Sequence, residues 1–386
     1  MLYVCQSLYK SKENYQEALD GIIFRYSEII KGLGIDFDLE REIASLKRSL
    51  FLGKVDQTVS HGEHIMAKIL AAYLGWEFVD ASQLVFFKND GTLDENKSFS
   101  AMSEILGRLE HAVVPGFYGV MPNGNIKTFP RGGSDVTGAI IARALKADLY
   151  EKWTEKSKIY IADPKIVPES DAIKKMTYNE MRELHHMGGV NMLHDDVIFL
   201  LQDVKIPVNI RNVNNPEYPG TMITADALEG RKTIAACIAG SRNFKFMKIK
   251  KYGMNKMSDV GARLFSILSR HGIPFEHCLS GIDSISIVLK NAKFDLRRNE
   301  INREINDIIK PDSITVEKDL SIIAVIGEGM GTVLGTFAKV FDSIAAFGIK
   351  VRMIDEGADE LNILLGVYDE DFNATVNALY KGMFAN

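Results

Sequence analysis

A short polar stretch carries the residues best suited to chemistry. Arg131, Gly132, Gly133, Ser134 and Asp135 follow a glycine-bearing loop and precede an apolar, alanine-rich run. Ser134 and Asp135 occupy the place of a helix N-cap, whose side chains accept from the first N–H groups. The glycines leave the backbone bare for a ligand, and Arg131 offers a fork to a carboxylate or phosphate. Since helix N-termini attract anions, the stretch predicts an anion-binding site; an ordinary capped helix after a tight turn is the alternative.

Short elements must position this stretch. The sequence predicts a strand at 112–114, a turn at Asn123-Gly124 and a helix at about 136–147. Residues 1–50 are expected to be mostly helical, because apolar side chains recur there three and four positions apart. Glycine and aspartate at 32–36 predict a break in this helical region.

A second candidate residue, Glu63, lies in a helix predicted at 60–74. Ser60 and Glu63 have the spacing of a capping box, which is the purely structural interpretation of this glutamate. His61, Glu63 and His64 lack the HExxH spacing of a zinc protease. We therefore expect surface histidines and no metal site.

Two patterns predict the fold. Strands alternate with helices between residues 76 and 224, which is typical of an α/β layered domain with a largely parallel sheet. Further along, the chain repeats itself: Phe265 matches Phe341, and Leu289 matches Leu365, each pair 76 positions apart. Each copy fits a ferredoxin-like βαββαβ unit.

Residues 321–331 form a strand followed by a glycine-rich turn, which resembles a dinucleotide-binding fingerprint. The third glycine is at the wrong spacing, and no further βα units follow. The repeat explains the run better, as the first strand and loop of the second copy.

Length and composition exclude some classes of protein. A chain of 386 residues suggests roughly two to three domains. The net charge of −5 without a basic run argues against nucleic acid as a partner. Three cysteines form no CxxC pair, which favours a reducing compartment. No apolar run is long enough for a membrane span, and the first residues do not read as a signal peptide, so we expect a cytoplasmic protein.

The polar stretch belongs to a longer pattern. GFYG followed by KTFPRGGSDVTG, within 115–138, resembles the aspartokinase signature. Residues 163–168 are similar to the Asp-Pro-Arg segment of that family, and 206–221 to the segment that closes its kinase domain. The C-terminal repeat resembles the tandem ACT domains that follow the kinase domain in aspartokinases. The resemblance covers nearly the whole chain, in order.

The resemblance implies a domain organisation and an activity. The expected domains are an amino-acid kinase domain at 1–228, lacking its first strand, and ACT domains at 229–315 and 316–386. The implied activity is phosphorylation of L-aspartate by ATP, with Mg²⁺, to give 4-phospho-L-aspartate, the first step of lysine, threonine and methionine biosynthesis.

The resemblance also assigns roles to residues. Glu63 is expected to hold the ammonium group of aspartate, Arg131 its carboxylate, and Ser134 and Asp135 to position substrate and reacting groups. The residues expected to face the nucleotide are Thr154, Glu155, Tyr160, Asp163 and Lys165. Two of these differ from the family: Glu155 replaces an aspartate, and Lys165 replaces an arginine, which keeps the charge but loses the planar fork.

The ACT pair implies an amino-acid effector, lysine or threonine, and at least a homodimer. Six polar residues occupy the effector region of the family: Asn255, Ser258, Asp259, Glu276, Ser280 and Asp283. For each of them, an ordinary polar residue in a turn is an interpretation of equal weight.

One departure concerns the start of the family pattern. Aspartokinases begin with a strand carrying Lys-Phe-Gly-Gly, whose lysine reaches the phosphates, and the given sequence has no such segment. Residues 1–5 are instead similar to a helix that follows this strand in the family. The expectation is therefore an aspartokinase without its first strand–loop–helix unit. A catalytically impaired or non-catalytic amino-acid-sensing oligomer is the second hypothesis.

Overall fold

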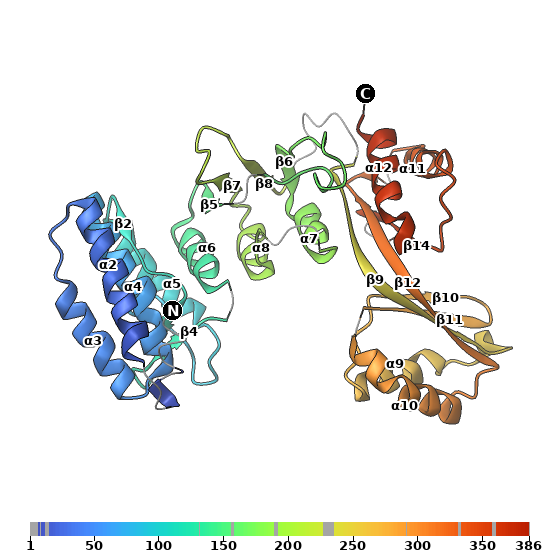
Figure 1. Ribbon diagram of the computed structural model, residues 1–386, viewed down its shortest axis with the longest axis horizontal. Coiled ribbons are helices and arrows are strands. Elements are labelled where there is room, and N and C mark those ends of the chain that lie inside the picture. Colours follow the sequence, from blue (N-terminus) through green and yellow to red (C-terminus); the bar gives the residue numbers. More distant parts are fainter. Residues whose placement is uncertain are drawn as a thin grey trace. The chain divides into compact units, whose positions relative to one another are not determined.

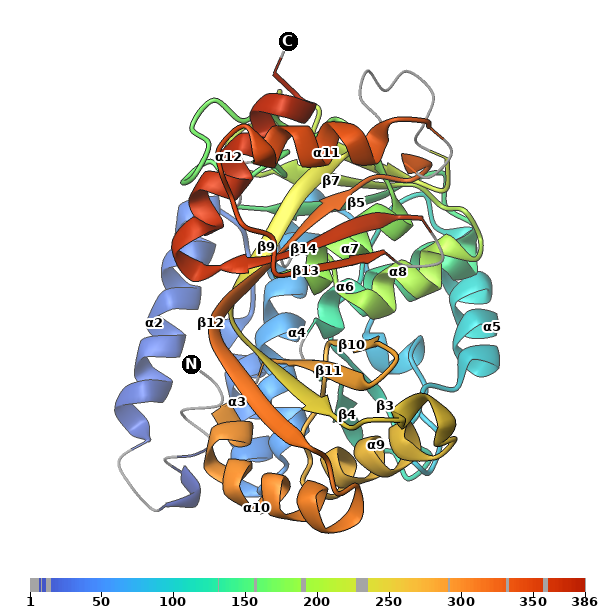
Figure 2. The ribbon, with the colours of Figure 1, turned by 90° about the vertical axis from the view of Figure 1, so that its right-hand side faces the viewer.

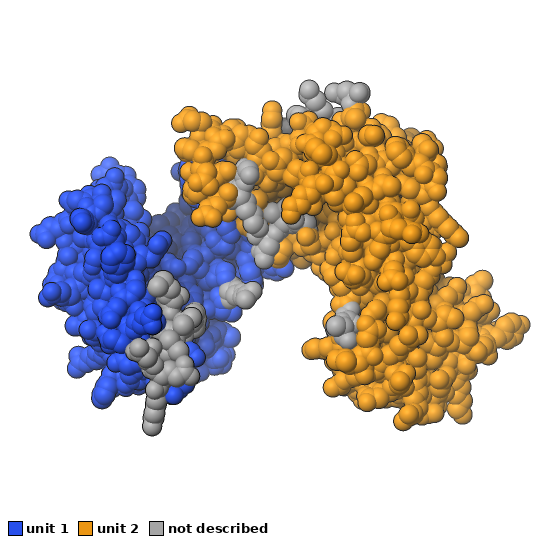
Figure 3. Space-filling view, viewed as in Figure 1, with its two compact units in different colours: residues 1–153, 193–210 blue, residues 154–192, 211–386 orange. Residues whose placement is uncertain are grey.

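The computed structural model describes residues 7, 9–11, 15–130, 132–155, 158–188, 192–226, 235–290, 292–330, 333–356 and 360–385. Figures 1 and 2 show the ribbon from two directions. By its internal contacts the chain divides into two units, coloured in Figure 3. Unit 1 comprises residues 1–153 and 193–210, and unit 2 comprises residues 154–192 and 211–386.

Three helices form one layer of unit 1: α2 (Gln16–Leu33), α3 (Leu39–Phe51) and α4 (Val55–Leu74). They lie side by side (Figure 1), and leucine and isoleucine side chains at helical spacing form a core between them. Gly34 ends α2 in the left-handed conformation, with φ 64°. The helices predicted within residues 1–50, with their break, are confirmed for residues 15–50; much of 1–14 lies outside the described residues.

Helix α4 begins earlier than the sequence predicts. It starts at Val55, so Ser60 lies inside it and donates its hydroxyl to the Gln57 carbonyl 2.9 Å away. The capping box predicted for Ser60 and Glu63 is therefore wrong. The reason is that the buried face of the helix already includes Val59 and continues upstream of Ser60.

Short strands and helices build the rest of unit 1. β1 (Glu77–Phe78) pairs in parallel with β2 (Ala112–Val113), and β3 (Tyr118–Val120) forms a hairpin with β4 (Ile126–Thr128). The predicted Asn-Gly turn joins β3 to β4, with Gly124 at φ 78°. The helices are η1 (Ala81–Gln83), α5 (Glu95–Ile105), η2 (Leu106–Arg108), α6 (Gly133–Leu145) and α8 (Asp195–Gln202).

A four-stranded sheet has the order β5-β7-β8-β6. Its strands are β5 (Tyr150–Thr154), β6 (Lys175–Thr177), β7 (Val208–Asn212) and β8 (Thr221–Thr224). β6 and β8 are parallel, as are β1 and β2, which agrees with the predicted layered α/β domain. In unit 2, α7 (Tyr178–His186) follows β6.

A six-stranded antiparallel sheet forms much of unit 2, in the order β10-β11-β9-β12-β14-β13. Its central strands, β9 (Cys237–Lys250) and β12 (Ser313–Ile326), have 14 residues each and run side by side (Figures 1 and 2). The outer strands are β10 (His277–Ser280), β11 (Ser284–Leu289), β13 (Met353–Glu356) and β14 (Asn362–Tyr368). The helices are η3 (Met254–Lys256), α9 (Val260–Arg270), α10 (Ala292–Ile308), α11 (Thr336–Ala345), η5 (Asp369–Asp371) and α12 (Phe372–Met383).

Each half of this sheet has its own hydrophobic core. One core includes Leu264 of α9 and Phe294 of α10, and the other includes Val340 of α11 and Leu379 of α12. The pairing of β9 with β12 shifts register near Leu320, where the two halves meet. The tandem ferredoxin-like fold predicted from the repeat is confirmed, and residues 321–326 are part of a sheet strand, as expected.

The exact domain boundaries stay predictions. The boundary at 228/229 lies outside the described residues, and the one at 315/316 falls within β12. Ala235 and Ile238, at the start of the expected first ACT copy, pack in the core of the second half.

Among the described residues, no helix combines the length and the apolar character that crossing a bilayer requires.

The core of the first ferredoxin-like half provides a stability test. Phe294 is fully buried, whereas Leu296, two residues along the same helix, is 86% exposed. We expect Phe294→Ala to lower the free energy of unfolding by about 3–5 kcal/mol through lost burial and a residual cavity. Leu296→Ala is the control, with a change within about 0.5 kcal/mol. Urea unfolding followed by circular dichroism measures both, and equal effects would contradict this assignment of the core.

Candidate functional site

A cavity of about 860 Å³ opens in unit 1, lined by residues of α2, α4 and the loop that leads into α6. Most of its walls are apolar or backbone. Among the described lining residues, the charged side chains are Arg25, Glu63 and Asp135. A largely apolar cavity with a few polar groups is typical of a small-molecule site.

The structure brings three of the predicted substrate residues to this cavity: Glu63, Ser134 and Asp135. Arg131 lies outside the described residues. Ser134 and Asp135 are not caps as predicted, because α6 begins at Gly133 and Gly132 is its N-cap, with φ 83°. Both side chains instead stand on the first turn of α6, where the helix dipole favours an anion.

Two glycines let the loop pack directly on this first turn. A Cβ on Gly116 would lie 2.8 Å from the Ser134 Cα, and one on Gly133 would lie 2.5 Å from the Phe129 Cβ. Neither position accepts a side chain without a shift of the loop relative to the first turn of α6. The glycine at 133 thus serves close packing within the chain, rather than the bare approach of a ligand that the sequence suggested.

A strained residue borders the cavity. Phe117 has φ 78°, which is unfavourable for a bulky side chain. Its N–H donates to the Thr137 hydroxyl at 2.9 Å, and its carbonyl accepts from the Phe129 N–H at 2.8 Å. The Thr137 hydroxyl donates in turn to the Gly133 carbonyl at 2.9 Å. Buried Thr137 therefore fixes both Phe117 and the start of α6.

Glu63 faces the cavity from α4. Partial burial among the cavity walls raises the pKa of Glu63 above its ordinary value. Burial, and secondarily the charge of Glu63, raises the pKa of Tyr26, whose hydroxyl donates to the Gly62 carbonyl at 3.0 Å. A carboxylate in such surroundings suits a cationic group of a ligand, because the pair would relieve its poor solvation.

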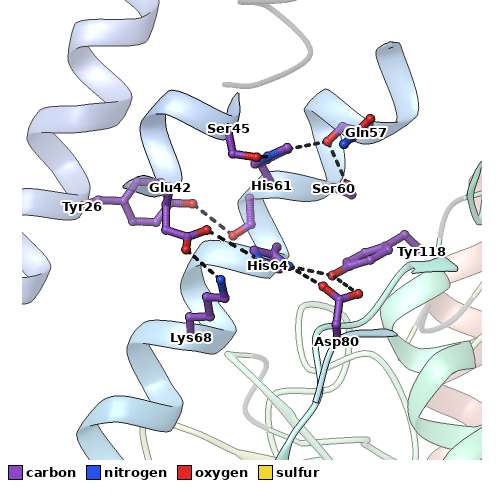
Figure 4. A network of polar contacts seen from close by, with 11 residues as sticks. Tyr26, Glu42, Ser45, Gln57, Ser60, His61, His64, Lys68, Asp80 and Tyr118 are labelled. Carbon is purple, nitrogen blue, oxygen red and sulfur yellow. Dashed lines mark hydrogen bonds and ion pairs between the residues drawn. The ribbon is translucent and has the colours of Figure 1, made fainter. Parts of the chain in front are cut away.

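A polar network connects α4 with the strand that follows Phe117 (Figure 4). His64 Nδ1 lies 3.0 Å from both Asp80 Oδ2 and Tyr118 Oη. On the other side of the ring, His64 Nε2 lies 3.5 Å from Glu42 Oε2, and Lys68 donates to Glu42 Oε1 at 2.7 Å. The network ties the helix that carries Glu63 to α3 and to β3.

Asp80 keeps its charge in this network. Burial alone would raise the pKa of Asp80, but hydrogen bonds from His64 and Ser82 outweigh burial and bring it to about 2. Burial raises the pKa of Tyr118, so its hydroxyl stays a neutral donor to Asp80. Stability from the ionised Asp80 is fully present above its unfolded-state pKa and is lost progressively as the pH falls from there through about 2.

The prediction that His61 and His64 lie at the surface is wrong. His61 is only 6% exposed, and His64 is held in the network. His61 Nδ1 donates to the Gln57 carbonyl at 2.6 Å, and its Nε2 accepts from Ser45 at 3.2 Å. Burial lowers the pKa of His61. Within the described residues, no group of three or more His, Cys, Asp or Glu side chains is placed to hold a metal ion.

The predicted nucleotide residues belong to unit 2. Thr154 ends β5, and Tyr160 bridges to Ala172. Glu155, Asp163 and Lys165 are exposed. The Asp163 carboxylate accepts from the backbone N–H of Lys165 at 3.0 Å, which is a local turn contact. Close by, the ammonium of Lys158 lies 4.6 Å from the centre of the Tyr218 ring.

Five of the six predicted effector residues lie at one end of the first ferredoxin-like half. The segment around η3 packs on the turn after β10: the Asn255 N–H donates to the Ile282 carbonyl at 3.1 Å, and Asp283 accepts from Gly253 at 2.7 Å. Asp259 is paired with Arg263 at 2.6 Å. The residues at this end are Asn255, Ser258, Asp259, Ser280 and Asp283.

Glu276 is separated from that group. It precedes β10, whereas Ser280 ends it, so they are roughly 13 Å apart along an extended strand. Glu276 lies 3.4 Å from His186 of α7.

Sequence reasoning missed several residues of the site. Thr137 is part of the signature stretch, but its contact with Phe117 crosses 20 positions. Lys152 of β5 forms an ion pair with Asp135, 17 positions away. The network of His64, Asp80 and Tyr118 could not be predicted from their spacing, because these residues lie in separate segments that only the fold brings together.

Comparisons with known proteins agree with this architecture. The amino acid kinase family matches residues 20–212, and an ACT domain matches residues 323–383. Aspartokinase 3 of Bacillus subtilis is 30% identical over 402 residues, which span 100% of this chain and 88% of that protein. The chain belongs to the aspartokinase family. The family and enzyme class expected from the signature, a phosphotransferase, are thereby confirmed.

Solved structures extend the match of this aspartokinase-family chain. Aspartate kinase of Clostridium acetobutylicum has a TM-score of 0.91 and 38% identity, over 99% of this chain and 88% of that one. E. coli aspartokinase III in complex with lysine and aspartate has a TM-score of 0.75 and 21% identity, over 99% and 90%. The same enzyme in complex with aspartate and ADP has a TM-score of 0.68 and 23% identity, over 96% of this chain and 86% of that one. The E. coli likeness shows the shared fold.

The Thr137 contact provides a test of the strained loop. Thr137→Val keeps the shape but leaves the Phe117 N–H without its acceptor. We expect the free energy of unfolding to fall by about 1–3 kcal/mol, the usual cost of an unsatisfied buried donor. Thr137→Ser keeps the hydroxyl and is the matched control. Urea unfolding of the full chain measures the difference, and a Val variant as stable as the Ser variant would contradict this role.

Proposed function

We propose that this chain transfers the γ-phosphoryl group of ATP to the side-chain carboxylate of L-aspartate, giving 4-phospho-L-aspartate. The observation that carries the proposal is the meeting of Glu63, Ser134 and Asp135 in one cavity. These are the described residues that the family pattern assigns to the substrate. The aspartate complexes of E. coli aspartokinase III support the same substrate class.

The chemistry requires little acid–base help. The attacking carboxylate has a reference pKa of about 3.9, so it is ionised at neutral pH and needs no general base. The difficulty is to bring this anion to a nucleotide triphosphate and to stabilise the charge on the transferring group. Cations, backbone N–H groups and exact positioning must supply the rate enhancement.

The three predicted substrate residues at the cavity each have a role in this reaction. Glu63 binds the ammonium group of aspartate, which matches its poorly solvated position on α4. Ser134 and Asp135, on the first turn of α6, orient the substrate near the positive end of the helix dipole. Arg131, outside the described residues, is assigned the substrate carboxylate by the family pattern alone.

ATP and Mg²⁺ complete the reaction. We assign the nucleotide to Thr154, Glu155, Tyr160, Asp163 and Lys165, and the E. coli complex with ADP supports a nucleotide site in this fold. Mg²⁺ usually takes one or two carboxylates together with the phosphate oxygens of the nucleotide. The ion would neutralise phosphate charge.

The ACT pair is proposed to bind an amino-acid effector, lysine or threonine. The lysine complex of E. coli aspartokinase III supports this class of ligand. We further propose feedback control, a homodimer or larger assembly, and a place at the first step of lysine, threonine and methionine biosynthesis.

The function is tested by incubating the full chain with ATP, Mg²⁺ and L-aspartate, and trapping the acyl phosphate with hydroxylamine. We expect aspartate-dependent hydroxamate, which lysine or threonine suppresses. Absence of product, with either amino acid still raising the melting temperature, would refute the kinase proposal and favour a non-catalytic sensor.

The raised pKa of Glu63 predicts a pH effect on substrate binding. Only the ionised carboxylate attracts the ammonium group, so the KM for L-aspartate rises as pH falls through this pKa, above the ordinary value of 4.5. We expect Glu63→Gln to raise the KM about 10- to 100-fold at neutral pH and to remove this pH dependence. Steady-state kinetics measure both effects.

Glu104→Gln, an exposed change on α5 with a side chain 70% accessible, is the matched control and should keep the pH profile of the wild type. A Glu63→Gln enzyme with an unchanged KM would contradict the assigned role.

A further inference from the structure

Lys152 is an unusual feature of strand β5. Its side chain is only 18% exposed, and its ammonium group forms an ion pair with Asp135 Oδ2, on a side chain 27% exposed. Burial of a lysine is costly unless its charge is compensated, and an apolar residue would pack on a strand face at lower cost. The charge at position 152 therefore requires a reason beyond packing, and its partner is a residue that lines the cavity.

Two side chains of strand β5 bind Asp135. Side chains alternate along a strand, so Tyr150 and Lys152 share one face. The Tyr150 hydroxyl donates to the backbone carbonyl of Asp135 at 3.3 Å, while Lys152 holds its carboxylate. Burial, and secondarily the charge of Asp135, raises the pKa of Tyr150, which keeps this donor neutral. The orientation of Asp135 is thus set by β5 as well as by α6.

The ion pair also changes the charge of the cavity. Its described lining includes two carboxylates, Glu63 and Asp135, and one cation, Arg25. Under the proposed function, Glu63 is neutralised by the substrate ammonium group. Asp135 has no such counter-charge from the substrate, whose reacting group is itself an anion. Without Lys152, an unpaired carboxylate would repel both the attacking carboxylate and the phosphates.

We propose that Lys152 is a positioning residue of the phosphoryl-transfer site, which orients Asp135 and cancels its charge so that two anionic substrates can meet there. The proposal rests on the proposed function and deepens it. Lys152 makes no covalent contribution: it acts on the reactants through Asp135.

The first experiment compares three variants of the full chain. Lys152→Met keeps the length and apolar stem but removes the charge, Lys152→Arg keeps the charge, and Lys47→Met removes an exposed charge from α3 in the same unit. We expect Lys152→Met to lower kcat/KM for L-aspartate by about 10- to 100-fold, and the other two to stay within about threefold of the wild type. Circular dichroism and melting temperature establish that each variant is folded.

The second experiment tests the sign of the effect. L-aspartate binding to the wild type, Lys152→Met, Asp135→Asn and the double variant is measured by calorimetry. Charge cancellation predicts that Lys152→Met weakens binding and that adding Asp135→Asn restores it at least partly, because the uncompensated carboxylate is gone. A role in packing alone predicts additive losses.

A loss of less than about tenfold in kcat/KM for Lys152→Met, an equal loss in Lys47→Met, or additive binding losses would overturn the proposal. If Lys152→Met does not fold, the Lys152→Arg kinetics and the Asp135→Asn binding decide. A wild type that turns over L-aspartate while Lys152→Met is unimpaired refutes only the role of Lys152. A wild type that neither binds nor phosphorylates L-aspartate refutes the proposed function and this role together.

Discussion

The site in unit 1 depends on direct contact between the backbone of a loop and the first turn of a helix. Gly116 lies against Ser134, and Gly133 lies against Phe129, at distances that leave no room for a Cβ. Thr137 then joins the loop to the helix by accepting from Phe117 and donating to Gly133. This contact holds a residue at positive φ and determines where the helix begins. Ser134 and Asp135, on this first turn, line the cavity.

Electrostatics explain why polar groups surround an apolar cavity. Asp80, kept ionised by hydrogen bonds, orients His64 on the helix that carries Glu63. Lys152 of β5 supplies the counter-charge of Asp135, which lines the cavity. Asp80 and Asp135 are thus paired, whereas Glu63, at the cavity itself, has a raised pKa. Partially buried charges are stabilised by fixed partners, so the least compensated carboxylate marks the place for a cationic ligand group.

Local patterns in the sequence predicted the elements and part of the site, whereas the rest of the site depends on the fold. The apolar periodicity within residues 1–50 and the repeat with a shift of 76 positions can both be read from the sequence, and both agree with the described architecture. The first residue of a helix was harder to predict, because Ser60 resembles an N-cap yet lies inside α4, which begins at Val55. The family signature identified Glu63, Ser134 and Asp135, which the structure places at one cavity. Residues such as Lys152 were not predictable, since their partners are distant in sequence and a lysine on a strand has no characteristic spacing.

In unit 2, the segment that carries Asp163 and Lys165 packs on the ferredoxin-like pair. Ala162 and Val167 belong to the same hydrophobic core as α12. Helix α12 also holds the segment by side-chain bonds to its backbone: Tyr380 to the Glu169 carbonyl at 3.1 Å and Asn377 to the Ile166 carbonyl at 3.2 Å. Asp163 and Lys165 therefore stand, exposed, on a backbone that α12 keeps in place. A close-packed core does not deform continuously, so a rearrangement of this half must carry the segment with it or break these contacts. Any coupling between the ferredoxin-like pair and these residues accordingly needs no separate relay, because the segment that carries them shares one core with α12.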